Sequence, residues 1–199
     1  MRRLGLAFAF GVLAAGAAPA ADSLERLHPD DLINPFLGPG YTSWLVGPVG
    51  QLADEEERTL YLLLESDDEA AAFVGEFWSR RDSGLRRQFD VRAAEADKRY
   101  SESGRLGRRT DRGMVYILFG DPEKTEWEEH RDIDDPDVQL WTYAKSAAKG
   151  LNGRKPARRY RFARDGDVMR LFSNDPADPA NRRRRMLRRI REPPRRPWP

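Results

Sequence analysis

The sequence contains no cysteine and only two histidines among its 199 residues. The absence of cysteine excludes disulfides, thiolate metal sites and thiol nucleophiles. It also excludes lipid attachment to a cysteine behind a leader peptide. His28 and His130 lie far apart in the sequence, so no zinc motif can be built from a histidine pair. We therefore expect neither a metal nor a cofactor.

Long apolar runs are also scarce, and the one that exists lies at the beginning of the chain. Arg2 and Arg3 precede an apolar stretch over residues 4–15, and Ala18-Pro19-Ala20 supplies the small side chains that signal peptidase accepts. An uncleaved anchor is the alternative, but this stretch is shorter than the roughly 20 apolar residues that cross a bilayer. The sequence predicts a signal peptide over residues 1–20, a periplasmic or secreted bacterial protein, and no transmembrane span after cleavage.

Charges of both signs are abundant but unevenly distributed. Residues 22–181 carry 24 basic and 32 acidic side chains, a net charge of −8, whereas residues 182–199 carry nine arginines and one glutamate. This asymmetry predicts an acidic body followed by a basic tail over residues 175–199. The tail suits an anionic surface or an acidic partner, or serves only solubility. Because the leader predicts export, we expect an envelope protein as partner and no nucleic acid.

Between the leader and the tail, the chain divides into an irregular arm and a domain. Residues 21–53 are rich in proline and glycine, and we expect them to pack on the body through Phe36 and Trp44. Beyond the arm, Asp54 and Ser66 are suitable helix caps, and apolar residues recur at helical spacing. This pattern predicts three helices, over residues 54–64, 66–81 and 85–102.

A sheet is predicted after the helices. β-branched and aromatic residues dominate four short runs, and a tight turn over residues 164–167 joins the last two. The runs cover residues 114–119, 138–144, 158–163 and 168–172. Residues 123–136 are predicted to form a long acidic loop. The expected fold class is α+β, with N-terminal helices packed on a small antiparallel β-meander.

Two motifs are specific enough to suggest a family. Residues 77–82 read Phe-Trp-Ser-Arg-Arg-Asp, and residues 107–113, which we call the signature segment, read Gly-Arg-Arg-Thr-Asp-Arg-Gly. In this order they resemble the GWxTD domain of exported bacterial proteins, with Arg108 in place of the family's tryptophan and Ser83 in place of a proline. The resemblance predicts a GWxTD-like domain over residues 54–174. It implies an exported domain of helices followed by a small sheet, without an established activity.

The polar residues of the two motifs form the candidate site. In one interpretation, Asp82 and Asp111 face a groove between the second helix and the first strand, as an acid–base pair or a cation site. In the other, Thr110 and Asp111 bond to the backbone of a turn, and ion pairs join Arg81 and Asp82 to Asp111 and Arg112. The second is favoured because no third group is evident to activate a nucleophile. The candidate binding or locking residues are Trp78, Arg81, Asp82, Thr110, Asp111 and Arg112.

Two further clusters have alternative interpretations. The acidic loop around His130 is either a Ca²⁺ or Mn²⁺ site or a solvated loop, and its spacing matches no EF-hand. Trp127, Trp141 and Tyr143 form either an aromatic platform for sugars or peptides, or part of the core.

From these observations we expect a non-catalytic envelope module that binds another protein through the exposed edge of its sheet or through the arm. The alternative is a hydrolase or carbohydrate-active enzyme that uses Asp82 and Asp111. Carboxylates about 5–10 Å apart in an open cleft would favour the enzyme.

Overall fold

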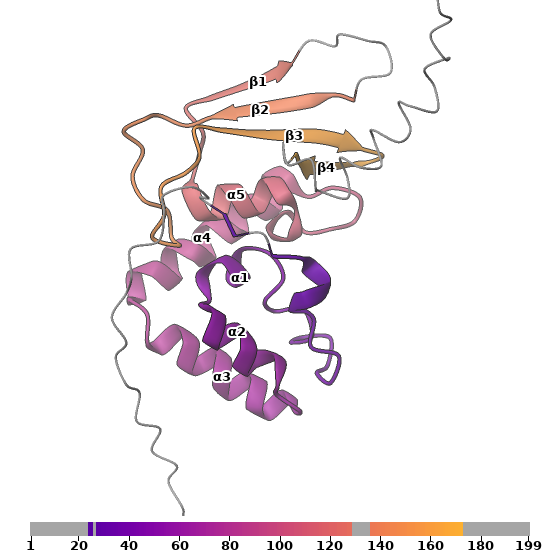
Figure 1. Cartoon of the computed structure of the whole chain (residues 1–199), viewed down its shortest axis with the longest axis vertical. Coiled ribbons are helices and arrows are strands. Elements are labelled where there is room, and N and C mark those ends of the chain that lie inside the picture. Colours follow the sequence, from indigo (N-terminus) through magenta and orange to yellow (C-terminus); the bar gives the residue numbers. More distant parts are fainter. Residues whose placement is uncertain (1–23, 26, 129–135, 173–199) are drawn as a thin grey trace, which may run out of the picture.

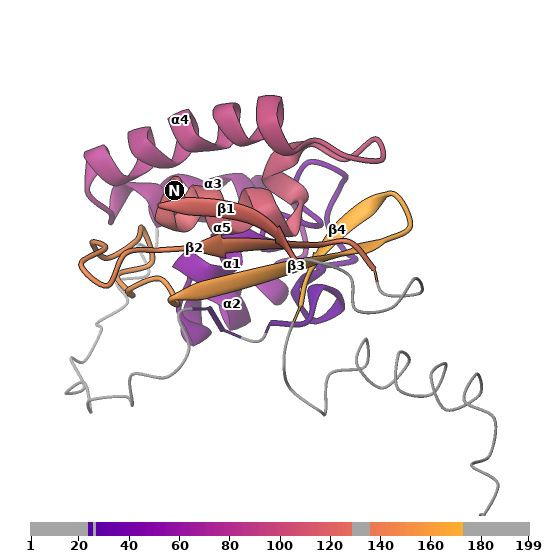
Figure 2. The same cartoon turned by 90° about the horizontal axis from the view of Figure 1, so that it is seen from above.

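The computed structural model describes residues 24–25, 27–128 and 136–172. Its described helices lie on one side of a four-stranded sheet, which gives the predicted α+β architecture (Figure 1). Figure 2 looks down on the other face of the sheet, over which none of the described elements lies. The helical elements are η1 (Pro29–Leu32), α1 (Pro48–Leu52), α2 (Glu55–Leu62), α3 (Asp67–Ser79), α4 (Ser83–Tyr100), η2 (Gly107–Arg109) and α5 (Asp111–Phe119). The strands are β1 (Lys124–Glu128), β2 (Val138–Thr142), β3 (Arg159–Asp165) and β4 (Val168–Leu171).

The three predicted helices correspond to α2, α3 and α4. The Asp54 carboxylate accepts the N–H of Glu57 at 2.7 Å, and the Ser66 hydroxyl accepts the N–H of Glu69, so both predicted caps are confirmed. Asp82 caps α4 in the same way. The first turns of α2 and α3 each carry three acidic side chains, which suit the positive end of a helix dipole.

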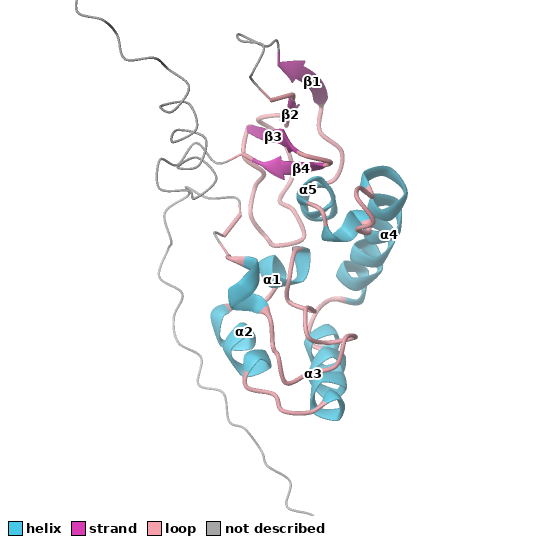
Figure 3. Ribbon diagram, turned by 90° about the vertical axis from the view of Figure 1, so that its right-hand side faces the viewer, coloured by secondary structure: helices cyan, strands magenta, loops and turns pink. Residues whose placement is uncertain are grey.

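The predicted strand over residues 114–119 is wrong, because this run belongs to helix α5. Thr110 caps α5, and Gly120 ends it with a φ of 79°, a conformation that glycine adopts freely. Figure 3 shows α5 directly beneath the strands, with α4 beside it. A helix covered on several sides needs no polar face, and a short apolar run of this kind cannot be told from a buried strand by its periodicity.

The fourth strand of the sheet is β1, which lies within the predicted acidic loop. The strands pair in the order β1-β2-β3-β4, all antiparallel, so the predicted meander is confirmed with β1 in place of residues 114–119. The predicted turn between the last two strands is also confirmed, with Gly166 at a φ of 60°. β1 shows no apolar alternation because, as an edge strand, it is exposed along most of its length.

The core joins the inner face of the sheet to the helices and to the arm. Trp141, Tyr160 and Phe162 are buried on the face of the sheet that packs on the helices. Trp141 and Tyr143 are at most 3% exposed, which supports the core interpretation of these aromatics and leaves Trp127 as the only exposed member of the proposed platform.

The arm packs through Trp44 but not through Phe36. The ring of Trp44 lies 4.9 Å from those of Tyr61 and Phe77, as predicted for this side chain. Phe36 is 73% exposed, so its predicted packing is wrong. The reason is the buried Asn34, whose Nδ2 donates to the carbonyls of Tyr61 and Leu64 while its Oδ1 accepts the N–H of Phe36. The polar side chain takes the inner position and leaves the neighbouring aromatic ring outside.

The leader over residues 1–20, His130 and the basic tail over residues 175–199 lie outside the described residues. Within the described part, no helix combines the length and apolar character that a membrane span requires.

Candidate functional site

The signature segment begins with a glycine that lies against the backbone of α4. A Cβ atom at Gly107 would lie 1.8 Å from the carbonyl oxygen of Ala96, and one at Gly113 would lie 1.8 Å from the carbonyl oxygen of Gly107. Neither distance is possible between two non-bonded atoms. The two glycines therefore allow the segment to pack directly on α4 and α5 to pack directly on the segment.

Thr110 connects the two glycines. Its hydroxyl donates to the carbonyl of Gly107 at 2.9 Å and accepts the N–H of Gly113 at 3.1 Å. The side chain is 4% exposed. The predicted bonding of Thr110 to the backbone is confirmed, although the turn begins a helix rather than a strand.

Asp111 and Glu102 hold the last strand in place. The N–H of Leu171 donates to Oδ2 of Asp111 at 2.6 Å, and the N–H of Met169 donates to Oε1 of Glu102 at 3.1 Å. Both N–H groups belong to β4 and point away from β3. Carboxylate acceptors of backbone N–H groups form strong, charge-assisted bonds, so these two side chains close the β4 edge of the sheet.

Arg112 joins the same cluster from α5. Its guanidinium donates to Oε2 of Glu102 at 2.7 Å and reaches the amide oxygen of Gln139 at 3.5 Å. Gln139 also accepts the indole N–H of Trp141. Arg112 thus pairs with Glu102 and not with Asp82, which corrects the predicted ion pair.

Burial raises the pKa of the Asp111 carboxyl above its ordinary value. The N–H of Leu171 and the charge of Arg170 oppose this shift, and the charge of Glu102 adds to it. A pKa raised by folding means that the group's contribution to stability is full at low pH and is lost as the pH rises through the folded pKa.

We expect Asp111→Asn to remove the pH-dependent contribution of Asp111 to stability, because the amide oxygen still accepts the N–H of Leu171 but does not titrate. Measured by urea unfolding between pH 4 and pH 7, the stability of the wild type should fall relative to the variant as the pH rises. Asp111→Ala is the control, since it leaves the N–H of Leu171 unsatisfied and should cost about 1–3 kcal/mol. Parallel pH curves for the wild type and Asp111→Asn would contradict the prediction.

Arg81, in the other motif, forms an ion pair that the sequence did not predict. Its Nη2 lies 2.6 Å from Oε2 of Glu57, and its Nη1 lies 3.0 Å from Oε1. The guanidinium also donates to the carbonyls of Leu52 and Phe77 and lies 3.4 Å from the centroid of the Phe77 ring. The predicted lock from Arg81 to the signature segment is therefore wrong. Arg81 instead ties α3 to α1 and α2.

The structure does not bring Asp82 and Asp111 together. The Asp82 carboxylate is exposed and accepts the N–H of Gly84 at the start of α4. Asp111 lies near Glu102, just beyond the other end of α4. An 18-residue helix spans about 27 Å at ~1.5 Å per residue. Neither an acid–base pair nor an ion-paired lock can be formed across that length.

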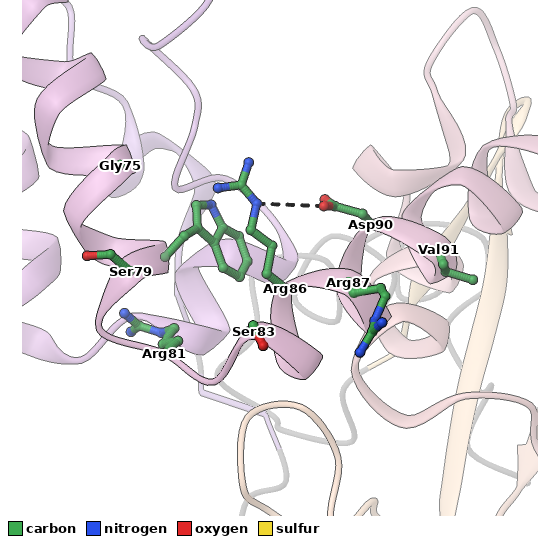
Figure 4. Close-up of a pocket in the computed structure, with 9 residues that line it drawn as sticks. Gly75, Ser79, Arg81, Ser83, Arg86, Arg87, Asp90 and Val91 are labelled. Atoms are coloured by element: carbon green, nitrogen blue, oxygen red, sulfur yellow. Dashed lines mark ion pairs between the residues drawn. The ribbon is translucent and has the colours of Figure 1, made fainter.

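Trp78, Arg81 and Ser83 line an open groove of about 520 Å³ between the end of α3 and the start of α4 (Figure 4). The Arg86 guanidinium lies 5.4 Å from the centroid of the Trp78 ring and 3.7 Å from Asp90. Trp78 itself is largely buried. The groove thus presents arginines, two serines and one carboxylate, Asp90, which is paired with Arg86.

In the three described ranges, no three acidic or histidine side chains are grouped so that they could hold a metal ion. Residues 129–135 of the acidic loop, which include His130, lie outside these ranges, so its proposed metal site stays a sequence-based alternative.

The family model of the GWxTD domain matches residues 43–165. Because this match covers more than half of the chain, the chain belongs to the GWxTD domain family. The fold that the resemblance implied, helices followed by a small sheet, is the fold observed. No curated protein and no solved structure matches the chain.

Arg108 stands where the family has its tryptophan and forms a compact ion pair. Its Nε and Nη2 lie 2.7 Å and 2.6 Å from Oδ2 of Asp97, and its backbone N–H donates to Oδ1. Burial alone would raise the pKa of Asp97, but the hydrogen bonds and charge of Arg108 outweigh it and lower that pKa. In this chain an ion pair, rather than an aromatic ring, fixes the signature segment to α4.

Proposed function

We propose that this protein is an exported, non-catalytic module that binds another cell-envelope protein by adding a strand of that partner to β1. The observation that supports this proposal is the difference between the two edges of the sheet. The β4 edge is closed, because Glu102 and Asp111 accept its outward N–H groups. A strand edge whose outward N–H groups are already bonded has no donors left to pair with another chain.

The direction of the β1 backbone groups follows from the bonds on either side of β2. The N–H of Tyr143 donates to the carbonyl of Arg158, and that of Arg164 donates to the carbonyl of Asp137. The odd-numbered residues at both ends of β2 therefore face β3. Because successive residues of a strand direct their backbone groups to opposite sides, the even-numbered residues of β2 face β1.

The register between β2 and β1 determines which residues of β1 face outward. Leu140 of β2 pairs with Glu126 of β1, so Glu126 and its even-numbered neighbours bond to β2. The N–H and C=O groups of Thr125 and Trp127 consequently point away from the sheet. Among the described residues they have no hydrogen-bond partner. This edge offers the row of free backbone groups that strand addition requires.

Trp127 gives the free edge a means of selecting its partner. Its side chain is 54% exposed and lies on the same face as Trp141, next to Gln139. The alternating β1 residues on the opposite face are charged: Lys124, Glu126 and Glu128. A partner strand would gain backbone bonds from the edge and specificity from an apolar side chain against Trp127.

The other expectations fit this proposal. The separation of Asp82 from Asp111 removes the geometric basis of the hydrolase alternative. The leader over residues 1–20 would deliver the module to the periplasm or the exterior, and the basic tail would hold it near an anionic surface.

Thr125→Pro tests the proposal. The Thr125 N–H points outward, so proline removes a docking donor without removing a bond to β2, which is the position where edge strands tolerate proline. In capture from envelope extract, the wild type and Thr125→Val, which retains the N–H, should hold the same partner, whereas Thr125→Pro should lose it while melting near the wild-type temperature. Equal capture by a folded Thr125→Pro variant would show that β1 is not the binding edge.

A further inference from the structure

The described body is divided into two halves of opposite charge. Residues 29–76, which contain most of the arm, α1, α2 and most of α3, carry eleven acidic side chains and one basic side chain, a net charge of −10. Residues 77–128 and 136–172 carry 21 basic and 13 acidic side chains, a net charge of +8. A basic ligand is therefore attracted to the first half and repelled by the second.

The acidic half also exposes an apolar patch, which we call the arm–α2 patch. It consists of Ile33, Phe36, Leu60 and Leu63, with Phe36 and Leu63 at least 70% exposed. The two bonds from Asn34 to the carbonyls of Tyr61 and Leu64 hold the arm against the last turn of α2. Ile33 and Phe36, the neighbours of Asn34 in the arm, thus lie beside the end of α2 that carries Leu60 and Leu63. Large apolar side chains gathered in this way mark an interaction surface.

The acidic side chains around this patch are not neutralised. Glu65 lies in the connection between α2 and α3, and Asp68 lies in the first turn of α3. Glu56 lies one helical turn before Leu60 in α2. All three are exposed, and none has a cationic partner among the described residues. The surface therefore combines apolar side chains with unpaired negative charge.

We propose that the arm–α2 patch binds the arginine-rich segment 182–191 of this same chain. That segment has seven arginines around Met186, Leu187 and Ile190, so its composition is complementary to the patch in both charge and apolar content. Charged groups supply the long-range attraction, and the apolar side chains supply burial of about 25 cal/mol per Å².

The connection is long enough for binding within one chain. Nine residues separate Phe172 from Arg182 and can span about 30 Å when extended. A domain of this size has a radius of gyration of about 14 Å, so the connection spans about twice this radius and is long enough for the segment to fold back onto the body. The contact involves neither β1 nor β4, so it is independent of the proposed strand addition, but it competes with an anionic surface for the arginines of the tail.

The absence of cysteine makes a direct test possible in the full chain. Leu63→Cys combined with Leu187→Cys should form an intramolecular disulfide under mild oxidation. The control combines Leu187→Cys with Val91→Cys, because Val91 is 64% exposed and lies on α4 in the basic half. We expect the first pair to form at least tenfold faster than the control. Because Leu63 and Val91 are both exposed, neither substitution should affect folding.

A second variant tests the electrostatic part. Adding Glu65→Lys and Asp68→Lys should slow disulfide formation by the Leu63–Leu187 pair severalfold at low salt, and 1 M NaCl should have the same effect on the unmodified pair. Equal rates for the Leu63 and Val91 pairs would overturn the proposal. Exclusive formation of linked dimers would also overturn it, since the segment would then bind a second copy.

Discussion

Replacing Gly107 with alanine is expected to destabilise the protein by about 3 kcal/mol or more, because the new methyl group has no space. Its Cβ would lie 1.8 Å from the carbonyl oxygen of Ala96 and 2.9 Å from the Cα of Asp97. Both atoms belong to the backbone of α4, so no side-chain rotation can relieve the contact. Accommodation would require η2 to move away from α4, which would disturb the Thr110 cap of α5. Urea unfolding monitored by tryptophan fluorescence measures the loss.

Gly75→Ala is the matched control for Gly107→Ala. Gly75 lies within α3, and a Cβ atom there would meet nothing within 4 Å. Alanine in an open helical position lowers the entropy of the unfolded chain and should stabilise the protein by up to about 1 kcal/mol. The two substitutions add the same methyl group with opposite expected signs. A small effect at Gly107 would mean that the signature segment does not rest on α4 as described.

The helices α2, α3 and α4 could be predicted because local signals mark each of them, with a recurring apolar spacing in all three and a cap as well in α2 and α3. Asp54 and Ser66 supply caps, and the apolar side chains recur at a spacing that places them on one buried face. Strands β2, β3 and β4 were equally accessible from alternation and from the glycine turn at Gly166. In each of these elements the local preference and the tertiary environment agree.

Residues 111–128 were mispredicted because tertiary position overrode the local pattern. α5 is covered by both the sheet and α4, so its composition resembles that of a buried strand, while β1 is exposed and resembles a loop. The caps were the usable signal, since Thr110 precedes the helix and Gly120 ends it. β1 offers no such signal, because its residues are mostly polar and exposed, and only its pairing with β2 makes it a strand.

Only the motif residues of the candidate site could be predicted, because tertiary packing decides which side chains become their partners. The motifs identify Arg81 and Arg112 as residues that need partners, but Glu57 is one of three consecutive glutamates and Glu102 lies between α4 and η2, outside both motifs. Only the packing of the helices selects these two glutamates. Motif residues therefore reveal where an interaction is needed and not which side chain completes it.

Glu57 provides the second large effect. Its side chain is 10% exposed and that of Arg81 is 18% exposed, so the ion pair is mostly buried. Glu57→Ala should cost about 3–5 kcal/mol, because the guanidinium of Arg81 would remain in the interior without its counter-charge. The substitution also removes the bond from the N–H of Asp54 to Oε2 of Glu57, one half of the cap on α2. Glu56→Ala, at the exposed neighbouring position, should change stability by no more than about 0.5 kcal/mol.

A double substitution separates the value of the pair from the penalty of breaking it. Glu57→Met with Arg81→Met replaces both charges by apolar chains of similar length, and such replacements of buried ion pairs are often close to neutral. We expect the double variant to be more stable than either Glu57→Ala or Arg81→Ala, with strongly non-additive single effects because the two side chains are in direct contact. Additive losses in denaturant unfolding would show that Glu57 and Arg81 act separately, and that the lock between α1, α2 and α3 does not depend on their pairing.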